Sequence, residues 1–477
     1  MSSKKQAPSP LVNALSCYTK KQSIRFHMPG HKANDKIRFN EKLKKNLFNW
    51  DVTEIPGLDN LHEPKGVILK SEKLLAKLYG AKRSFFLVNG STSGNVSMMG
   101  AAVSPNQKLI VSRASHRSVL SGLILTGADP IYVMPKFDRE LGVFTQPSVN
   151  DIKNTINKAP DARAIILTNP VYQGFCPDIK SACLIAGQNN INVLVDEAHG
   201  PHFALSPLLP HSAGDFDVDA WVQSPHKILC SLTQSAWLHI KGQKMNINKV
   251  MSWLELMTST SPSYILMASL DLTRALMQDE GKELIEYTLE LAQHARHQIN
   301  KFSPFYCVGS EVVGKRGIFD IDLSRLMVNV SSAGYTGHMV QEILIDKYNI
   351  YPEYSDFYNV YFLLSFSNTK KDIKHLVKAL SCFKERCKLK DLPKPPYILP
   401  NKVMKPKKAF FKDGEFLPLK DCIGRIIKKE LILYPPGIPI VMPGEVLDKN
   451  HVEYILQILK MGGSCQGIKG NLICVVK

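Results

Sequence analysis

Between about residues 84 and 240, the sequence alternates short apolar, β-branched runs with longer amphipathic stretches, and this alternation restricts the possible folds more than any other feature. The apolar runs include 85–88, 109–111, 164–167 and 193–195. Runs that are apolar throughout are typical of strands in a parallel sheet, because helices cover both faces of such a sheet. The sequence therefore predicts an α/β fold with a buried, largely parallel sheet.

The chain of 477 residues exceeds one typical domain, so we expect two or three units with a sizeable core. Helical periodicity resumes around 263–301, a second α/β region extends to about residue 390, and the proline-rich segment 393–396 indicates a linker. We therefore predict an N-terminal arm, a large domain, a small α/β domain and a C-terminal domain. Their predicted bounds are 1–45, 46–301, 302–392 and 393–477.

Several classes of protein are disfavoured by the sequence. The N-terminal segment 1–10 is polar, and no apolar run approaches the roughly 18 residues of a membrane span. The ten cysteines are scattered without any C-x-x-C pair, which argues against a zinc site or a disulfide framework and for reduced thiols. We expect a cytoplasmic protein with no membrane partner and no metal.

The net charge of +18 raises the alternative of a nucleic-acid-binding protein. Basic residues are, however, spread along the chain, and the densest run, 402–412, has no recognisable nucleic-acid-binding module around it. We interpret the charge as a solvated surface and expect no nucleic-acid partner.

Polar segments follow the carboxyl ends of three predicted strands, where ligands bind in open α/β sheets. They are 89–95, 196–200 and 224–227. In the first, Ser91 and Thr92 offer hydroxyl groups and free backbone N–H groups at the start of a helix, which suits a phosphate. Taken alone, this segment is equally typical of a helix cap.

The other two segments contribute a carboxylate and an amine. Asp196 would pair with a protonated pyridine nitrogen and make the ring an electron sink, although an Asp after a strand is also a common loop initiator. Lys227 offers an amine, and Ser224 and His226 offer two possible phosphate donors. Partial burial or a nearby cation would lower the pKa of Lys227 and favour the neutral amine that imine formation requires. A single loop lysine is more often a solvated charge, but the three segments in this order indicate a pyridoxal-phosphate (PLP) enzyme.

The resemblance to one family extends over nearly the whole chain. Its motifs are Phe-His-Met-Pro-Gly-His-Lys at 26–32, Leu-Asp-Asn-Leu-His at 58–62, Ser-His-Arg-Ser at 115–118, 196–200, 224–227 and Tyr-Pro-Pro-Gly-Ile-Pro at 434–439. With these motifs the chain resembles the bacterial ornithine/lysine/arginine decarboxylases, in particular the compact, arginine-decarboxylase-like branch without the wing domain. The resemblance implies a fold-type I PLP-dependent (aspartate aminotransferase-like) large domain with a mostly parallel sheet, a smaller α/β domain and a C-terminal domain.

The resemblance also assigns roles to individual residues. It gives the cofactor phosphate to Ser91, Thr92, Ser224 and His226. His116 would stack on one face of the ring and Ala198 would pack on the other. Asp196 would hold the pyridine nitrogen, and Lys227 would form the Schiff base. Without the resemblance, a histidine before a helix such as His116 is more typical of a hydrogen-bonded cap.

Further residues are implied at a subunit interface and at the substrate. Ser259, in the hydroxyl-rich segment 258–261, resembles the family's cluster that reaches the phosphate of the neighbouring subunit, which implies a homodimer or a higher homo-oligomer. Glu445 matches the acidic residue that faces the distal cation of the substrate, with a surface glutamate near a turn as the alternative. Asp356 and Glu353 are weaker candidates for the same task.

The implied function is the PLP-dependent decarboxylation of a basic L-amino acid to its amine, feeding polyamine metabolism. Arginine, giving agmatine, ranks first, before lysine, giving cadaverine, and ornithine, giving putrescine. Lys227 and His226 are both candidates for the group that protonates Cα. Since a fold does not fix a reaction, an aminotransferase, an aldol-type lyase and a non-catalytic PLP-binding protein remain alternatives. An aminotransferase usually needs an arginine for the α-carboxylate of its substrate, and the sequence singles none out.

Overall fold

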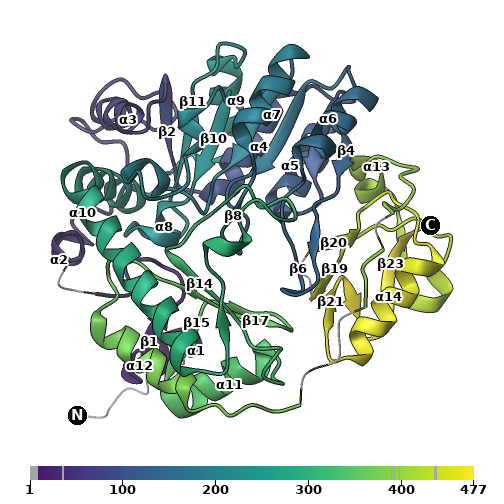
Figure 1. Cartoon of the computed structure of the whole chain (residues 1–477). Helices are drawn as coiled ribbons and strands as arrows, with labels where there is room; N and C mark the ends of the chain where they lie inside the picture. Colours follow the sequence, from purple (N-terminus) through teal and green to yellow (C-terminus); the bar gives the residue numbers. More distant parts are fainter. Residues whose placement is uncertain (1–8, 35–36, 388, 390–392, 397, 435–437) are drawn as a thin grey trace, which may run out of the picture.

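The computed structural model describes residues 9–34, 37–387, 389, 393–396, 398–434 and 438–477. Figure 1 shows a large α/β domain, a smaller α/β domain beside it and a C-terminal unit, drawn in yellow, at the edge of the large domain. Within the part of the chain that the structure describes, every helix is too short or too polar to cross a lipid bilayer.

A seven-stranded sheet in the order β2-β11-β10-β9-β7-β3-β4 forms the centre of the large domain. Its strands are β2 (Arg83–Leu87), β3 (Lys108–Ser112), β4 (Asp129–Val133), β7 (Ala164–Thr168), β9 (Asn192–Asp196), β10 (Ala220–Gln223) and β11 (Ala236–Ile240). Only β11 runs antiparallel to its neighbours in this sheet, β2 and β10. The predicted fold class, an α/β fold with a mostly parallel sheet, is therefore confirmed.

Helices pack on both faces of this sheet. The two sets are α4 (Gly90–Ala102), α5 (Arg117–Thr126) and α9 (Ile247–Met257) on one face, and α3 (Val67–Leu78), α6 (Val149–Lys158) and α7 (Ile179–Gln188) on the other. Successive strand residues point into the two cores alternately, as Ile165 and Ile166 of β7 do. This double burial explains why the strands are apolar throughout rather than at every second position.

The long helix α10 (Tyr264–Phe302) runs from the large domain to the small domain (Figure 1). The small domain has an antiparallel sheet in the order β12-β14-β17-β16, made of β12 (Tyr306–Cys307), β14 (Arg325–Asn329), β17 (Asn359–Leu363) and β16 (Tyr354–Ser355). Its helices are α11 (Gly337–Tyr348) and α12 (Lys370–Ser381). The N-terminal region adds β1 (Ile24–Phe26), which pairs in parallel with β15 (Ile350–Pro352) of the small domain.

The C-terminal unit has a core of its own, formed by two three-stranded sheets and α14 (Lys449–Lys460). The sheets are β18-β23-β22 and β20-β19-β21, with β18 (Gly414–Pro418), β19 (Leu431–Tyr434), β20 (Ile438–Val441), β21 (Ser464–Gln466), β22 (Ile468–Lys469) and β23 (Leu472–Val476). The remaining elements are α1 (Pro10–Lys20), α2 (Arg38–Asn46), β5 (Phe137–Asp138), β6 (Val143–Phe144), β8 (Phe175–Cys176), α8 (Pro225–Ile228), β13 (Asp320–Ile321) and α13 (Pro406–Phe411).

Gly30 allows the N-terminal motif 26–32 to pack directly on the loop that follows Lys227. The backbone N–H of Gly30 donates to the carbonyl of His226 at 2.8 Å. A Cβ atom at position 30 would lie 2.0 Å from the carbonyl oxygen of Leu229. The two segments can therefore approach this closely only because residue 30 has no side chain.

We expect Gly30→Ala to lower the midpoint of denaturant unfolding, since the new methyl group would push the backbone around Lys227 aside, and overpacking of this kind costs about 1–3 kcal/mol. Gly187→Ala in α7 is the matched control, because a Cβ at Gly187 meets no atom within 4 Å and alanine favours a helix. Equal midpoints for the two variants would contradict the close packing described for Gly30.

Candidate active site

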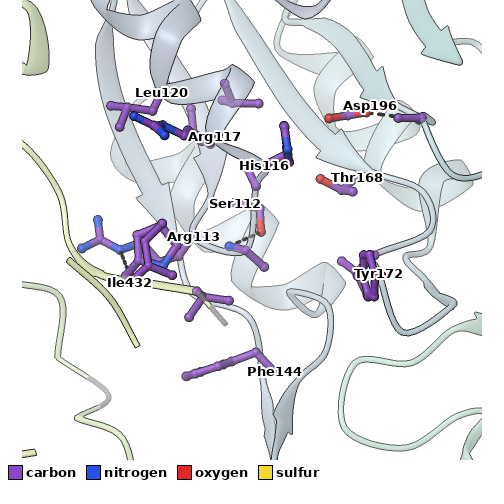
Figure 2. Close-up of a pocket in the computed structure, with 18 of the residues that line it drawn as sticks. Ser112, Arg113, His116, Arg117, Leu120, Phe144, Thr168, Tyr172, Asp196 and Ile432 are labelled. Carbon is purple, nitrogen blue, oxygen red and sulfur yellow. Dashed lines mark hydrogen bonds between the residues drawn. The ribbon is translucent and has the colours of Figure 1, made fainter. Parts of the chain in front are cut away.

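A cavity of about 460 Å³ opens at the carboxyl ends of three central strands. The last residues of β3, β7 and β9, which are Ser112, Thr168 and Asp196, all line it. Figure 2 shows Asp196, Thr168 and Tyr172 on one side of the cavity and Ile432, from the C-terminal domain, on the other. The small domain contributes Glu353 and Tyr354, so all three domains supply parts of the wall.

The structure brings six of the predicted site residues to this cavity: Ser91, His116, Asp196, Ala198, Lys227 and Glu353. The others do not line it: Thr92, Ser224, His226, Ser259, Asp356 and Glu445. Within the described ranges of the chain, no group of three His, Cys, Asp or Glu side chains is arranged as a metal site.

The amine of Lys227 lies in a largely desolvated environment in the short helix after β10. Desolvation lowers its pKa from 10.5 to about 8, the charge of Asp196 raises it, and the charge of Arg325 lowers it further. At pH 7 about one amine in ten is then neutral, compared with fewer than about one in a thousand for an ordinary lysine. Lys227 is thus prepared to act as a nucleophile.

Asp196 is held in place by two donors at the end of β9. Its Oδ1 accepts from the backbone N–H of Ala198 at 3.1 Å, and its Oδ2 accepts from Nδ2 of Asn95 at 2.8 Å. Asn95 also donates to Oγ of Ser118 at 2.9 Å. Asn95 was not among the predicted site residues, although its spacing of four residues from Ser91 places both on the same face of α4.

His116 combines two roles that the sequence presented as alternatives. It is the N-cap of α5, because its Nδ1 accepts from the backbone N–H of Ser118 at 3.2 Å, and its ring also lines the cavity. Desolvation lowers its pKa, the charge of Asp196 raises it, and the charges of Lys227 and Arg117 lower it. The ring is therefore neutral near pH 7 and, with Nδ1 as an acceptor, carries its proton on Nε2.

The two segments predicted to bind phosphate are joined by the turn 234–235. The carbonyl of Gln234 accepts from the N–H of Gly90 at 2.7 Å, and the carbonyl of Ser235 lies 2.8 Å from Nδ1 of His226. Gly90 begins α4, whose first backbone N–H groups have no partner within the helix and suit the binding of an anion. Oγ of Ser224 is buried and has no hydrogen-bond partner among the described residues. A ligand oxygen would satisfy these donors.

Glu445 occupies a different place from the one predicted for it. Its carboxylate accepts from both terminal nitrogens of Arg113, at 2.8 and 2.6 Å, and from the backbone N–H of Met442 at 2.7 Å. Both charged side chains are only 1% exposed. Arg113 lines the cavity, whereas Glu445 lies behind it. Because Arg113 already neutralises this carboxylate, Glu445 fixes the C-terminal domain to the end of β3 and is not available to a substrate cation.

Asp356 is also committed to the fold. It accepts from the hydroxyl of Tyr361 at 2.6 Å and from the backbone N–H groups of Tyr358 and Asn359, both at 2.8 Å. Burial raises its pKa to about 6, against these hydrogen bonds. Glu353, the other candidate in this segment, does line the cavity.

Ser259 is exposed, in a segment that lies beside Asn89, the N-cap of α4. Its backbone carbonyl lies 2.9 Å from Nε2 of His62, and the carbonyl of Met257 accepts from Nδ2 of Asn89 at 3.0 Å. Its predicted role concerns a second subunit and stays a prediction.

In the motif 434–439, residues 435–437 lie outside the described residues, and Tyr434, Ile438 and Pro439 line the cavity.

Comparison with known proteins establishes the family. The model of the major domain of Orn/Lys/Arg decarboxylases matches residues 9–326, and that of their C-terminal domain matches residues 393–473. The chain belongs to the Orn/Lys/Arg decarboxylase family. The family predicted from the motifs, and the predicted enzyme class of decarboxylase, are thereby confirmed.

Individual relatives agree with this assignment. The arginine decarboxylase of Bacillus subtilis is 35% identical over 99% of this chain and 98% of its own length, and that of Bacillus anthracis is 36% identical over 97% and 95%. Among solved structures, the Francisella novicida lysine decarboxylase LdcF superposes with a TM-score of 0.80 at 21% identity, over 98% of this chain and 81% of that one. The last comparison concerns the fold alone.

The residues of the cavity, together with Ser224, which is hydrogen-bonded to the lining residue Ala198, fit the cofactor PLP. Lys227 supplies an amine for the aldehyde, Asp196 a carboxylate for the pyridine nitrogen, and the start of α4 with Ser224 the donors for a phosphate. Oγ1 of Thr168, also buried in the wall, has no hydrogen-bond partner among the described residues, and such orphaned groups commonly mark a ligand contact.

We expect Arg113→Met and Glu445→Gln each to lower the free energy of unfolding by about 3–5 kcal/mol, because each leaves one uncompensated buried charge. The double variant Arg113→Met/Glu445→Gln should be more stable than either single variant, since it buries no charge. Unfolding in urea, followed by circular dichroism, measures all three. A Glu445→Gln protein as stable as the wild type would contradict the structural role of this pair.

Proposed function

We propose that this chain is a PLP-dependent decarboxylase of basic L-amino acids, with arginine as the preferred substrate before lysine and ornithine. The observation that carries the proposal is the buried amine of Lys227, with a pKa of about 8, in one cavity with the fixed carboxylate of Asp196. When bound, PLP supplies an electron sink that accepts the electron pair of the bond to the leaving carboxylate. The protein supplies binding, orientation and protonation states.

The proposed roles follow from the positions of the side chains. Lys227 holds the cofactor, and Asp196 keeps a proton on the pyridine nitrogen, because its carboxylate is oriented by Asn95 and is only 3% exposed. The neutral ring of His116 stacks on the pyridine. Ala198 packs on the opposite face, where its methyl group leaves room for the ring.

For the phosphate we propose the set predicted from the sequence: Ser91, Thr92, Ser224 and His226. Desolvation lowers the pKa of His226 to about 4, so its ring is neutral near pH 7. His226 does not line the cavity, and one of its nitrogens is engaged by Ser235. Of the two candidates for protonation of Cα, the geometry therefore favours Lys227.

The similarity to arginine decarboxylases supports the ranking of substrates. Four relatives with this name, three of them from Bacillus species, are 34–36% identical over 92–99% of the chain. The lysine decarboxylases among the relatives are 22–24% identical.

We also propose a cytoplasmic homodimer in which Ser259 reaches the phosphate of the second subunit. The amine that the enzyme releases would supply polyamine metabolism.

The aminotransferase alternative gains no support from Arg325 or Arg113. The guanidinium of Arg325 acts on Lys227 but already donates to Asp322 at 2.8 Å and to the carbonyl of His199 at 2.7 Å. Arg113 forms a buried ion pair with Glu445. Neither is free to receive the α-carboxylate of a substrate.

We expect purified protein with PLP to release carbon dioxide from arginine faster than from lysine or ornithine, and Lys227→Ala to abolish the release. A spectroscopic titration with PLP checks cofactor binding in the same samples. Keto-acid formation without carbon dioxide would favour aminotransfer. No turnover of any of the three amino acids by PLP-loaded protein would contradict the proposed function.

A further inference from the structure

Glu430 is a buried carboxylate in the cavity wall that neither the fold nor the cofactor site uses. Its side chain is 7% exposed, and it accepts no hydrogen bond from any of the described residues. Its ion pair is with Arg117, whose Nε lies 3.1 Å from Oε1 without the geometry of a hydrogen bond. A buried carboxylate with so little compensation is costly unless a cation completes its surroundings.

The other carboxylates near the cavity are already engaged. Asp196 and Glu353 each accept two hydrogen bonds, the latter from the backbone N–H of Met28 at 2.6 Å and the hydroxyl of Tyr172 at 2.7 Å. Glu445 accepts three and lies behind the wall. Among the carboxylates that line the cavity, Glu430 is therefore the one that accepts no hydrogen bond from the described residues.

The position of Glu430 suits the far end of an extended substrate. It directly precedes β19, which supplies Ile432 to the wall formed by the C-terminal domain. Figure 2 shows Arg117, Leu120 and Ile432 on the side of the cavity away from Asp196 and Tyr172. Leu120 and Ile432 are apolar, so this side offers contacts for an aliphatic stem together with a carboxylate for a cation.

Arg117 has the features of a counter-ion that can be replaced. Its side chain is 56% exposed, whereas that of Glu430 is buried. A half-exposed ion pair is worth little because water screens it, so exchanging this guanidinium for another cation costs little. The exchange leaves the charge of the cavity unchanged, and a guanidinium that meets Glu430 through two parallel N–H groups would form the stronger, bidentate contact.

We propose that Glu430 binds the distal cation of the substrate, and that Arg117 holds this place in the free protein and is displaced when the substrate binds. This inference rests on the proposed function and names the residue that recognises the basic end of the amino acid.

Two variants of this ion pair test the inference, because they should change the KM for arginine in opposite directions. Glu430→Gln removes the partner of the substrate cation and should raise KM about tenfold or more, the loss expected for a hydrogen bond to a charged group, with kcat nearly unchanged. Arg117→Met removes the competing cation and should lower KM. Glu453→Gln makes the same change of charge at an exposed position of α14 in the same domain and should leave KM unaltered.

A purely structural ion pair would behave differently, since both variants would then impair the enzyme in the same direction. An increase of KM in Arg117→Met, or a KM within twofold of the wild type in Glu430→Gln, would overturn the inference. Calorimetric binding of agmatine to the PLP-loaded proteins separates this result from a failure of the proposed function. Absence of turnover in the wild type would refute the proposed decarboxylase function. Undiminished agmatine binding by Glu430→Gln would refute the role of Glu430 as the partner of the distal cation.

Discussion

The fixed negative charge of Asp196 is the constraint around which the cavity is organised. The carboxylate ends β9, is only 3% exposed, and is oriented by Asn95 from α4 and by the backbone of Ala198. It raises the pKa of both Lys227 and His116, against the desolvation that lowers them. Its effect on the pKa of Lys227 is larger than that of Glu353, the other carboxylate that raises it.

The domains contribute different groups to the cavity around Asp196. The large domain provides the reactive groups at the carboxyl ends of its strands, where parallel strands direct their last residues to one edge. The C-terminal domain closes the opposite side and is fixed there by the buried pair of Arg113 and Glu445. In the proposed roles, the reactive groups and the carboxylate that binds the substrate cation lie on different domains.

The fold class, and the meeting of Asp196 and Lys227 in one cavity, could be predicted because both depend on local signals. Asp196 and Lys227 each follow an apolar run, and the parallel sheet that such runs form brings their ends together. The buried ion pair of Glu445 could not be predicted in this way, since its partner Arg113 lies 332 positions away in the chain. Glu430 was missed because nothing in its neighbourhood in the sequence distinguishes a carboxylate in a cavity wall from one on the surface. Its significance depends on which groups remain unpaired after folding.

Among the described residues, two lysines have lowered pKa values, and they allow the central claim to be tested. Burial lowers the pKa of Lys32 to about 7, below the value of about 8 for Lys227. The amine of Lys32, however, donates to the carbonyls of His27 and Leu363 and does not line the cavity. Reduction of the PLP-loaded protein with borohydride, followed by peptide mass spectrometry, identifies the lysine that holds the cofactor. The geometry predicts the phosphopyridoxyl group on Lys227, and its appearance on Lys32, or on neither, would contradict the assignment of this cavity as the active site.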